Sequence, residues 1–324
     1  MSNFPRHLHN SLRLALTLCI HLALGDPLQA QDSAPKSPEF SFQVERVKAK
    51  SLGGRRARYG VFLPKGYKDK ANAQKSYPWV IWLHGMRGSL YKFRDNGGDV
   101  FSAMRKSGKI PAMILVTPSA GSMPLYMNGG AQGDLEDAVL KDIWGDVEKK
   151  FRVSKHRHET AIMGVSMGAL GAMKMALRFP EKFGSVAVHS GPVLPLDPAE
   201  MSGRFKRYGE FMQIDRVFGS PIDKKKWATE IPMAIIEAKP AKAFEGLRIY
   251  MDAGSADRYK FGEPNQEFSK ALTAKGIKHT FRFIKGGGHS WGAGAVQSAM
   301  QVSFPFVAEG FKTPPKKTPA PEKK

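Results

Sequence analysis

Short runs of apolar residues recur between residues 40 and 310, and polar or glycine-rich segments separate them. The first two runs, 40–44 and 59–63, lie on either side of Leu52-Gly53-Gly54, a pattern typical of two strands joined through a turn. The later runs are short and mostly apolar, as strands buried on both faces of a sheet are. They cover residues 79–83, 113–116, 161–163, 186–188, 247–251 and 281–284.

Helical patterns lie between these runs. Apolar side chains at four-residue intervals predict a helix with one buried face over residues 135–151. Those side chains are Leu135, Val139, Ile143, Val147 and Phe151. A second helix is expected over 169–179, and a small helical excursion over 200–242, which is rich in Lys and Met. The alternation of strands and helices predicts an α/β fold, with a mostly parallel central sheet flanked by helices on both faces.

The first 30 residues predict a signal peptide. Arg6 and Arg13 supply positive charge, residues 12–24 form an apolar run, and Ala30 offers a small residue for cleavage. The apolar run is short for a membrane span, so the mature protein is expected to have no transmembrane span. The expected location is secreted or periplasmic, and an uncleaved anchor is the alternative.

Composition sets the remaining boundaries. Residues 31–39 are expected to be a linker, residues 40–310 one catalytic domain, and the Pro/Lys-rich residues 311–324 a disordered tail. The only cysteine, Cys19, lies in the first apolar run, and Leu18 before it disfavours a lipoprotein anchor. A mature chain without Cys19 has no thiol chemistry, no disulfide and no Cys-ligated zinc.

The chain is strongly basic, with 50 Lys and Arg against 29 Asp and Glu and a formal charge of +21. Most of that charge lies between the two terminal segments, so the folded body itself is basic. A basic body favours contact with an acidic polymer or another anionic surface, although it can also serve solubility alone. The sequence holds no zinc knuckle, RNP sequence or helix-turn-helix signature, so no nucleic-acid partner is expected.

The strongest chemical signal is Gly164-Val165-Ser166-Met167-Gly168, which follows one predicted strand and opens a predicted helix. This is the context of a nucleophile elbow, in which the serine occupies a strained strand-to-helix turn. The flanking glycines keep bulk away from the turn, and the helix N-terminus presents N–H groups to a developing oxyanion. Ser166 is therefore the candidate nucleophile, and a glycine-rich turn without chemistry is the alternative.

A serine hydroxyl needs a base, and three histidines follow apolar runs. His289 ends the last predicted strand downstream of Ser166, which matches the Ser…Asp…His order of hydrolases with this elbow. The neighbouring glycines allow its loop to approach the serine. His84 comes too early in the chain and is assigned to an oxyanion loop, and His189 is assigned a structural role.

The acid that orients the imidazole should lie between the serine and the histidine, directly after a strand. Asp252 and Asp257 both follow the run 247–251. Asp257 is favoured because Gly254-Ser255-Ala256 carries it far enough from the strand to reach the histidine. Asp252 remains the alternative, and its position at the strand end suits a residue that braces the loop.

The backbone N–H groups of Met86 and Met167 are the candidate oxyanion hole, because one follows an earlier strand end and the other follows the nucleophile. Their side chains receive no mechanistic role. Candidate substrate contacts are Tyr126 and Asn128, in the loop after the run 113–116, and Trp291 beyond the base. The expected chemistry requires no cofactor and no metal.

Residues 162–192 (IMGVSMGALGAMKMALRFPEKFGSVAVHSGP) resemble the esterase D-like family of α/β-hydrolases. That family includes S-formylglutathione hydrolase, tributyrin esterases, and feruloyl and acetylxylan esterases. The likeness extends to WLHG at 82–85, VFGSP at 217–221, GSAD at 254–257 and GGHSW at 287–291, and covers nearly all of residues 42–308. The resemblance implies an α/β-hydrolase fold, a triad of Ser166, Asp257 and His289, and oxyanion donors at Met86 and Met167. Ala169 stands where many members carry a second glycine.

We therefore expect a secreted serine carboxylesterase that cleaves small acyl or aryl esters, acting through an acyl-enzyme. Because a signal peptide disfavours a cytosolic role, acetyl or feruloyl esters of carbohydrate are the favoured substrates, and the partner is a small-molecule or polysaccharide ester. Two alternatives stay open: an acyltransferase to a sugar or lipid acceptor, and a catalytically inactive polyanion-binding protein on the same fold.

Overall fold

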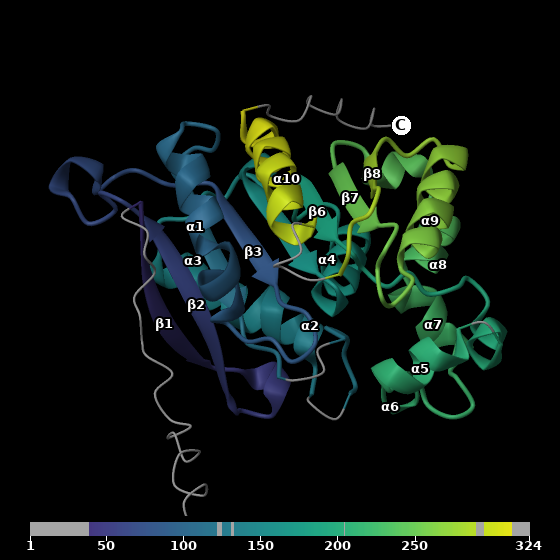
Figure 1. The fold of residues 1–324 in the computed structure, drawn as a ribbon. Helices are drawn as coiled ribbons and strands as arrows, with labels where there is room; N and C mark the ends of the chain where they lie inside the picture. The colour runs from purple at the N-terminus through teal and green to yellow at the C-terminus, as the bar shows by residue number, and fades with distance from the viewer. Residues whose placement is uncertain (1–38, 122–124, 131–132, 204, 290–294, 313–324) are drawn as a thin grey trace, which may run out of the picture. The chain divides into compact units, whose positions relative to one another are not determined.

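An eight-stranded sheet runs through the computed structural model, which describes residues 39–121, 125–130, 133–203, 205–289 and 295–312 (Figure 1). The strand order is β1-β2-β4-β3-β5-β6-β7-β8. β2 pairs antiparallel with β1 and with β4, and every other neighbouring pair is parallel. The strands are β1 (Phe40–Lys48), β2 (Arg56–Pro64), β3 (Trp79–Leu83), β4 (Ile114–Pro118), β5 (Thr160–Val165), β6 (Ser185–His189), β7 (Arg248–Gly254) and β8 (Thr280–Ile284).

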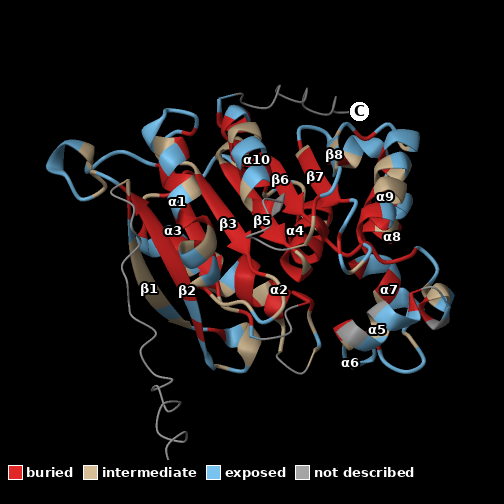
Figure 2. Ribbon diagram, viewed as in Figure 1, coloured by how far each residue is buried: buried red, intermediate tan, exposed pale blue. Residues whose placement is uncertain are grey.

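Each apolar run of the sequence forms one of these strands. β3, β4, β5 and β6 are buried along their whole length, because helices cover both faces of the sheet. Figure 2 shows β3, β5 and β6 in the colour of buried residues. β1 and β8 lie at the two edges and keep exposed positions. The predicted mostly parallel α/β sheet is therefore confirmed.

Helices pack in a layer on each face of the sheet. Helices α1 and α10 contribute Phe93, Phe101, Met300 and Phe304 to one apolar core. Helices α3, α4, α8 and α9 contribute to the core on the opposite face. The helices are α1 (Lys92–Lys106), α2 (Leu135–Asp137), α3 (Trp144–Lys150), α4 (Met167–Arg178), α5 (Lys206–Met212), α6 (Asp215–Phe218), α7 (Lys224–Glu230), α8 (Pro232–Ala238), α9 (Gly262–Ala274) and α10 (Ala295–Phe311).

The helix predicted over 135–151 is divided into three consecutive segments. A π-helical segment, η3 (Ala138–Ile143), joins α2 to α3. An α-helical turn has about 3.6 residues, so apolar residues spaced exactly four apart would move gradually around the surface of an α-helix. One wider π segment corrects that drift, and all five predicted apolar residues are buried.

The excursion predicted over 200–242 contains helices α5, α6, α7 and α8. Its apolar residues form a third core, which includes Phe218, Trp227 and Met167 and against which Met86 packs. The excursion therefore contacts the elbow helix at its first residue. No helix among the described residues is both long and apolar enough to cross a bilayer.

Candidate active site

Ser166 occupies the sharp turn between β5 and α4. Its backbone has φ 57° and ψ −123°, a conformation that non-glycine residues seldom adopt. The turn requires glycine on both sides: a Cβ at Gly164 would lie 2.3 Å from the Gly168 carbonyl oxygen. A Cβ at Gly168 would lie 2.1 Å from the carbonyl oxygen of Leu83. The spacing of the motif thus follows from the close contact of the elbow with itself and with β3.

The three predicted triad side chains lie in one hydrogen-bonded row. His289 Nε2 is 2.9 Å from Ser166 Oγ, and His289 Nδ1 is 2.8 Å from Asp257 Oδ2. Asp257 also accepts a hydrogen bond from the backbone N–H of Tyr259, at 2.8 Å, and its side chain is fully buried. A carboxylate that accepts from Nδ1–H leaves Nε2 free to take the serine proton.

A second Ser–His–Asp row joins β6, β7 and α10. Asp252 Oδ2 is 2.7 Å from His189 Nδ1, and His189 Nε2 is 3.1 Å from Ser303 Oγ. His189 and Ser303 are 0% exposed and Asp252 is 2% exposed, so a substrate cannot reach this row. Asp252 therefore binds the buried His189 and does not brace the loop after β7, whereas Asp257 binds His289.

The loop after β3 lies beside the nucleophile. A Cβ at Gly85 would lie 3.0 Å from the Ser166 Cβ, so this loop passes directly against the serine. Met86 lines the pocket at the serine, and Met167 is the first residue of α4. Among the described residues, no group is recorded as accepting a hydrogen bond from the backbone N–H of Met86 or Met167. Both N–H groups are therefore available to an oxyanion.

His84 fixes the start of this loop. Its Nε2 accepts a hydrogen bond from the N–H of Ala120 at 3.2 Å, so Nδ1 carries the proton and donates to the Gly85 carbonyl at 2.8 Å. Burial lowers the pKa of the His84 imidazole below its ordinary value of 6.5, although the bond to Gly85 opposes this shift. His84 therefore supports the loop after β3 through hydrogen bonds at both ring nitrogens.

Acid should destabilise the protein partly through His84. Because its pKa is lower folded than unfolded, the unfolded chain binds more protons below about pH 6.5. The contribution of His84 is full above that pH and is lost as pH falls toward the lowered pKa. We expect His84→Gln, which can keep both hydrogen bonds, to unfold in urea with a smaller loss of stability between pH 7.5 and 5.5 than wild type. Equal losses in the two proteins would contradict this assignment.

Three predicted substrate contacts have different outcomes. Tyr126 is fully buried and donates its hydroxyl hydrogen to the His84 carbonyl at 3.1 Å, so the expectation that it contacts substrate is corrected: it supports the loop after β3. Asn128 accepts a hydrogen bond from the Asp137 N–H at 3.2 Å and does not line the pocket. Trp291 lies outside the described residues.

A buried ion network lies behind Tyr126 and was not predicted from the sequence. Lys174, on α4, is 0% exposed, and its Nζ lies 2.7 Å from Glu136, 2.8 Å from Glu230 and 2.7 Å from the Tyr126 carbonyl. Arg178 contacts the same two carboxylates, at 2.8 and 2.5 Å. The network joins the elbow helix to α2, to α7 of the excursion, and to the loop that holds His84.

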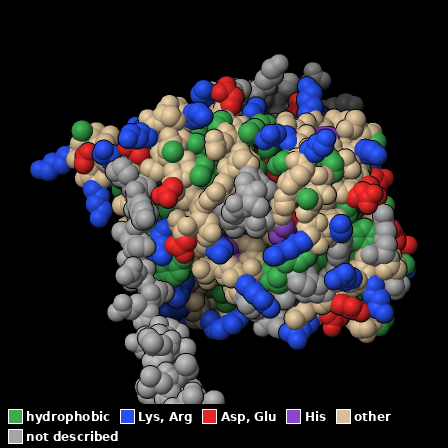
Figure 3. Space-filling view, in the orientation of Figure 1, with side chains coloured by type: hydrophobic (Ala, Val, Ile, Leu, Met, Phe, Trp, Pro, Cys, Tyr) green, Lys and Arg blue, Asp and Glu red, His purple; other side chains and the backbone are tan. Residues whose placement is uncertain are grey.

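A pocket of about 320 Å³ opens at Ser166. Ser166 and His289 line it together with Met86, Lys92 and Arg258. Figure 3 shows histidine side chains within a hollow on this face, with Lys and Arg side chains beside it. Among the described residues, no group of three or more His, Cys, Asp or Glu side chains is placed to hold a metal ion.

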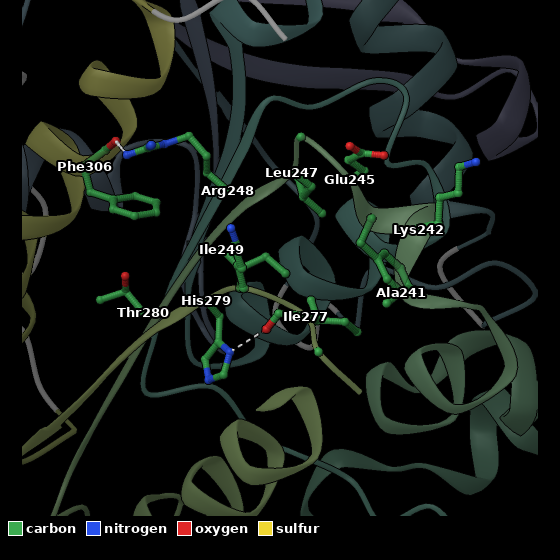
Figure 4. A pocket seen from close by; sticks show the side chains of 14 residues that line it. Ala241, Lys242, Glu245, Leu247, Arg248, Ile249, Ile277, His279, Thr280 and Phe306 are labelled. Carbon is green, nitrogen blue, oxygen red and sulfur yellow. Dashed lines mark hydrogen bonds between the residues drawn. The ribbon is translucent and has the colours of Figure 1, made fainter. Parts of the chain in front are cut away.

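A larger cavity, of about 580 Å³, lies at the opposite end of the strands, where β7 and β8 begin (Figure 4). One guanidinium nitrogen of Arg248, in the lining of this cavity, donates to the Phe306 carbonyl at 3.1 Å. His279 bonds to the Ile277 carbonyl at 2.9 Å and to Ser269 Oγ at 2.7 Å, without a recorded carboxylate partner in the described chain. The larger cavity therefore lacks the three-residue row found at Ser166.

Comparison with known proteins identifies the family of this chain. The model of the family described as "Putative esterase" matches residues 49–304, most of the chain. The chain belongs to this esterase family. The matched range includes Met86, Ser166, Asp257 and His289, the residues of the candidate site.

Relatives of this chain include a Mycobacterium tuberculosis protein, Esterase Rv1288. It is 24% identical over 249 residues, 70% of this chain and 51% of the relative, so the chain spans about half the length of the curated relatives it matches. Among solved structures, a ferulic acid esterase is 27% identical with a TM-score of 0.69, covering 84% of this chain and 99% of that one. An S-formylglutathione hydrolase from Agrobacterium tumefaciens is 19% identical with a TM-score of 0.67, covering 86% and 99%. The predicted α/β-hydrolase fold is confirmed.

Proposed function

We propose that this esterase is a serine carboxylic ester hydrolase with Ser166 as nucleophile, His289 as base and Asp257 as the acid that orients it. The observation that carries the proposal is the row of hydrogen bonds from Asp257 through His289 to Ser166 Oγ, at 2.8 and 2.9 Å, at a pocket. The row that ends at Ser303 has the same residue types but is buried, so a substrate cannot reach it. Only the row at Ser166 opens to a pocket, and it is therefore the proposed catalytic row.

Acylation begins when His289 Nε2 takes the Ser166 proton and Oγ attacks the ester carbonyl carbon. The carbonyl π bond opens onto its oxygen, and the resulting oxyanion accepts hydrogen bonds from the N–H groups of Met86 and Met167. The Asp257 carboxylate stabilises the imidazolium. The C–O bond of the ester then breaks, and His289 returns the proton to the leaving alcohol oxygen.

Deacylation repeats these steps with water. His289 takes a proton from the water, and the hydroxide oxygen attacks the carbonyl carbon of the Ser166 ester. The same two N–H groups stabilise the second oxyanion. Collapse breaks the bond to Oγ, His289 returns the proton to the serine, and the carboxylic acid leaves. The enzyme is regenerated without consumption of any other reactant.

The proposed substrates are acetyl or feruloyl esters of carbohydrate, outside the cytoplasm. The likeness to a ferulic acid esterase over 84% of this chain supports the substrate class. The charged start and apolar run within residues 1–30 support export. Turnover of methyl ferulate and acetylated xylan above that of simple alkyl esters is expected. The N-terminus of the protein recovered from an exporting host is expected at residue 31.

Covalent labelling tests the nucleophile directly. We expect a fluorophosphonate probe to attach to wild type at one site, which peptide mass spectrometry would map to Ser166. His289→Ala should slow labelling strongly, because the base activates the serine. Ser303→Ala is the matched control, since it removes the serine of the buried row, and it should label as wild type does. A label on another residue, or equal labelling of Ser166→Ala, would refute the proposal.

A further inference from the structure

Two cationic side chains line the pocket beside the proposed nucleophile. Lys92 and Arg258 are both exposed, and none of the described residues that line the pocket is Asp or Glu. We propose that the ester's alcohol part carries a carboxylate, which Lys92 and Arg258 bind. This inference rests on the proposed function and specifies its substrate class: an acyl ester of a hydroxyl on an acidic sugar or a hydroxy acid.

Arg258 is free to meet a ligand. It directly follows Asp257, and its guanidinium lies over the Tyr259 ring, 4.9 Å from the ring centre. No ion pair is recorded for it within the described chain. Stacking on a ring orients the planar guanidinium and leaves its N–H groups for a planar anion such as a carboxylate.

Lys92, the first residue of α1, lines the same pocket. Its neighbour one turn along, Asn96, also lines the pocket and donates a hydrogen bond to the Lys92 carbonyl at 3.0 Å. The acidic residue in this first turn, Asp95, pairs with Arg94 at 2.8 Å and not with Lys92. Among the described residues, the Lys92 ammonium forms no ion pair, so it too can bind an anion.

The placement of Arg258 indicates which part of the ester carries the charge. His289 returns its proton to the leaving alcohol oxygen, so the alcohol part lies on the His289 side of the carbonyl. The Tyr259 ring packs edge-on against the His289 ring with centres 4.6 Å apart, and Arg258 covers Tyr259. In the proposed mechanism the Met86 and Met167 N–H groups bind the carbonyl oxygen instead. Arg258, which lies over the ring that packs on His289, is therefore placed to meet the alcohol part.

The charge of the whole chain agrees with such a substrate. The chain has a formal charge of +21, which favours approach of a polymer that carries many carboxylates. Lys and Arg side chains beside the hollow in Figure 3 extend the same preference outside the pocket. Local cations would then select the ester, and the surrounding surface would raise the concentration of the polymer near the site.

The test uses esters that differ only in charge. 4-Acetoxybenzoate and 4-acetoxybenzamide have the same acetyl group and nearly the same shape, and only the first has an anionic alcohol part at pH 7.5. The measured quantity is the ratio of their kcat/KM values, which cancels effects of a variant on chemistry common to both. Relative to wild type, we expect this ratio to fall about threefold to fivefold in Lys92→Gln and in Arg258→Gln, the range of partly exposed charge pairs.

Two controls isolate the pocket charges. Lys106→Gln removes the same charge at the far end of α1, about 21 Å along the helix axis, and should keep the wild-type ratio. A second ester pair, phenyl succinate monoester and phenyl succinamate, places the charge on the acyl part. If Lys92→Gln and Arg258→Gln change the ratio of kcat/KM values only for the succinate pair, the two cations bind the acyl part. That result would overturn the proposal that the alcohol part carries the carboxylate.

The outcomes separate this inference from the proposed function. Hydrolysis of all four esters with ratios that no variant changes would overturn the anion inference and leave the esterase proposal intact. Absence of hydrolysis for every ester would overturn the esterase proposal itself. A wild-type preference for 4-acetoxybenzoate that weakens in 0.5 M salt and in both pocket variants would support the carboxylate site.

Discussion

Replacing Ser166 by alanine is expected to lower kcat/KM for p-nitrophenyl acetate by about 10⁴-fold to 10⁶-fold. The variant keeps the pocket and the N–H groups of Met86 and Met167 but has no oxygen to form the acyl-enzyme. Residual turnover then depends on direct attack by water, with the oxyanion hole as the main remaining help. Alanine has no Oγ to bond with His289, and the strain at φ 57° remains, so stability should change little.

The matched control for this variant is Ser303→Ala. Ser303 belongs to a row with the same three residue types, 3.1 Å from His189, but it is fully buried. Its removal should leave p-nitrophenyl acetate turnover within about twofold of wild type. The two variants are compared at equal concentrations of folded protein, checked by circular dichroism. Loss of turnover in Ser303→Ala with retention in Ser166→Ala would reverse the assignment of the nucleophile.

The fold could be predicted from the sequence because both signals on which it depends are local. A strand buried on both faces must be apolar at successive positions, so β3 to β6 are visible as short apolar runs. The elbow is visible for a different reason. A Cβ at either glycine would lie less than 2.5 Å from a backbone oxygen of the turn itself or of β3. Gly164 and Gly168 are therefore required two residues before and after Ser166.

The partners of each polar side chain were harder to predict, because they depend on distant segments. Asp252 and Asp257 both follow β7, and only the structure shows that one faces His189 and the other His289. Tyr126 was predicted to contact substrate because its loop follows β4. The sequence does not show that its hydroxyl turns inward to the carbonyl of His84.

The ion network around Lys174 illustrates the same limit. One signal was present: Lys174 is the only charged residue between Ala169 and Leu177, in a helix that is otherwise apolar there. A lone lysine in such a stretch indicates a buried or snorkelling charge. Its partners, Glu136 and Glu230, lie 38 and 56 positions away in the chain, and no local pattern connects them to it.

Replacing Lys174 by methionine is expected to destabilise the protein by about 3–5 kcal/mol, the cost of leaving buried charges without their partner. Methionine fills a similar volume but cannot neutralise Glu136 or Glu230. Arg178 alone would then face both carboxylates, and the Tyr126 carbonyl would lose its donor at 2.7 Å. The loss should be measured by urea unfolding at pH 7.5.

Lys141→Met is the matched control for this prediction. Lys141 also pairs with a carboxylate, Asp137 at 2.6 Å, but its side chain is 69% exposed, so water already screens the pair and its loss should change stability far less than the loss of Lys174. Adding Glu136→Gln to Lys174→Met should recover part of the lost stability, because it removes one unpaired buried charge. If Lys174→Met and Lys141→Met cost the same, the buried network would not stabilise the contact between the elbow helix and α7. A larger loss in Lys174→Met, partly recovered by Glu136→Gln, would show that this contact depends on charge neutralisation and not on packing alone.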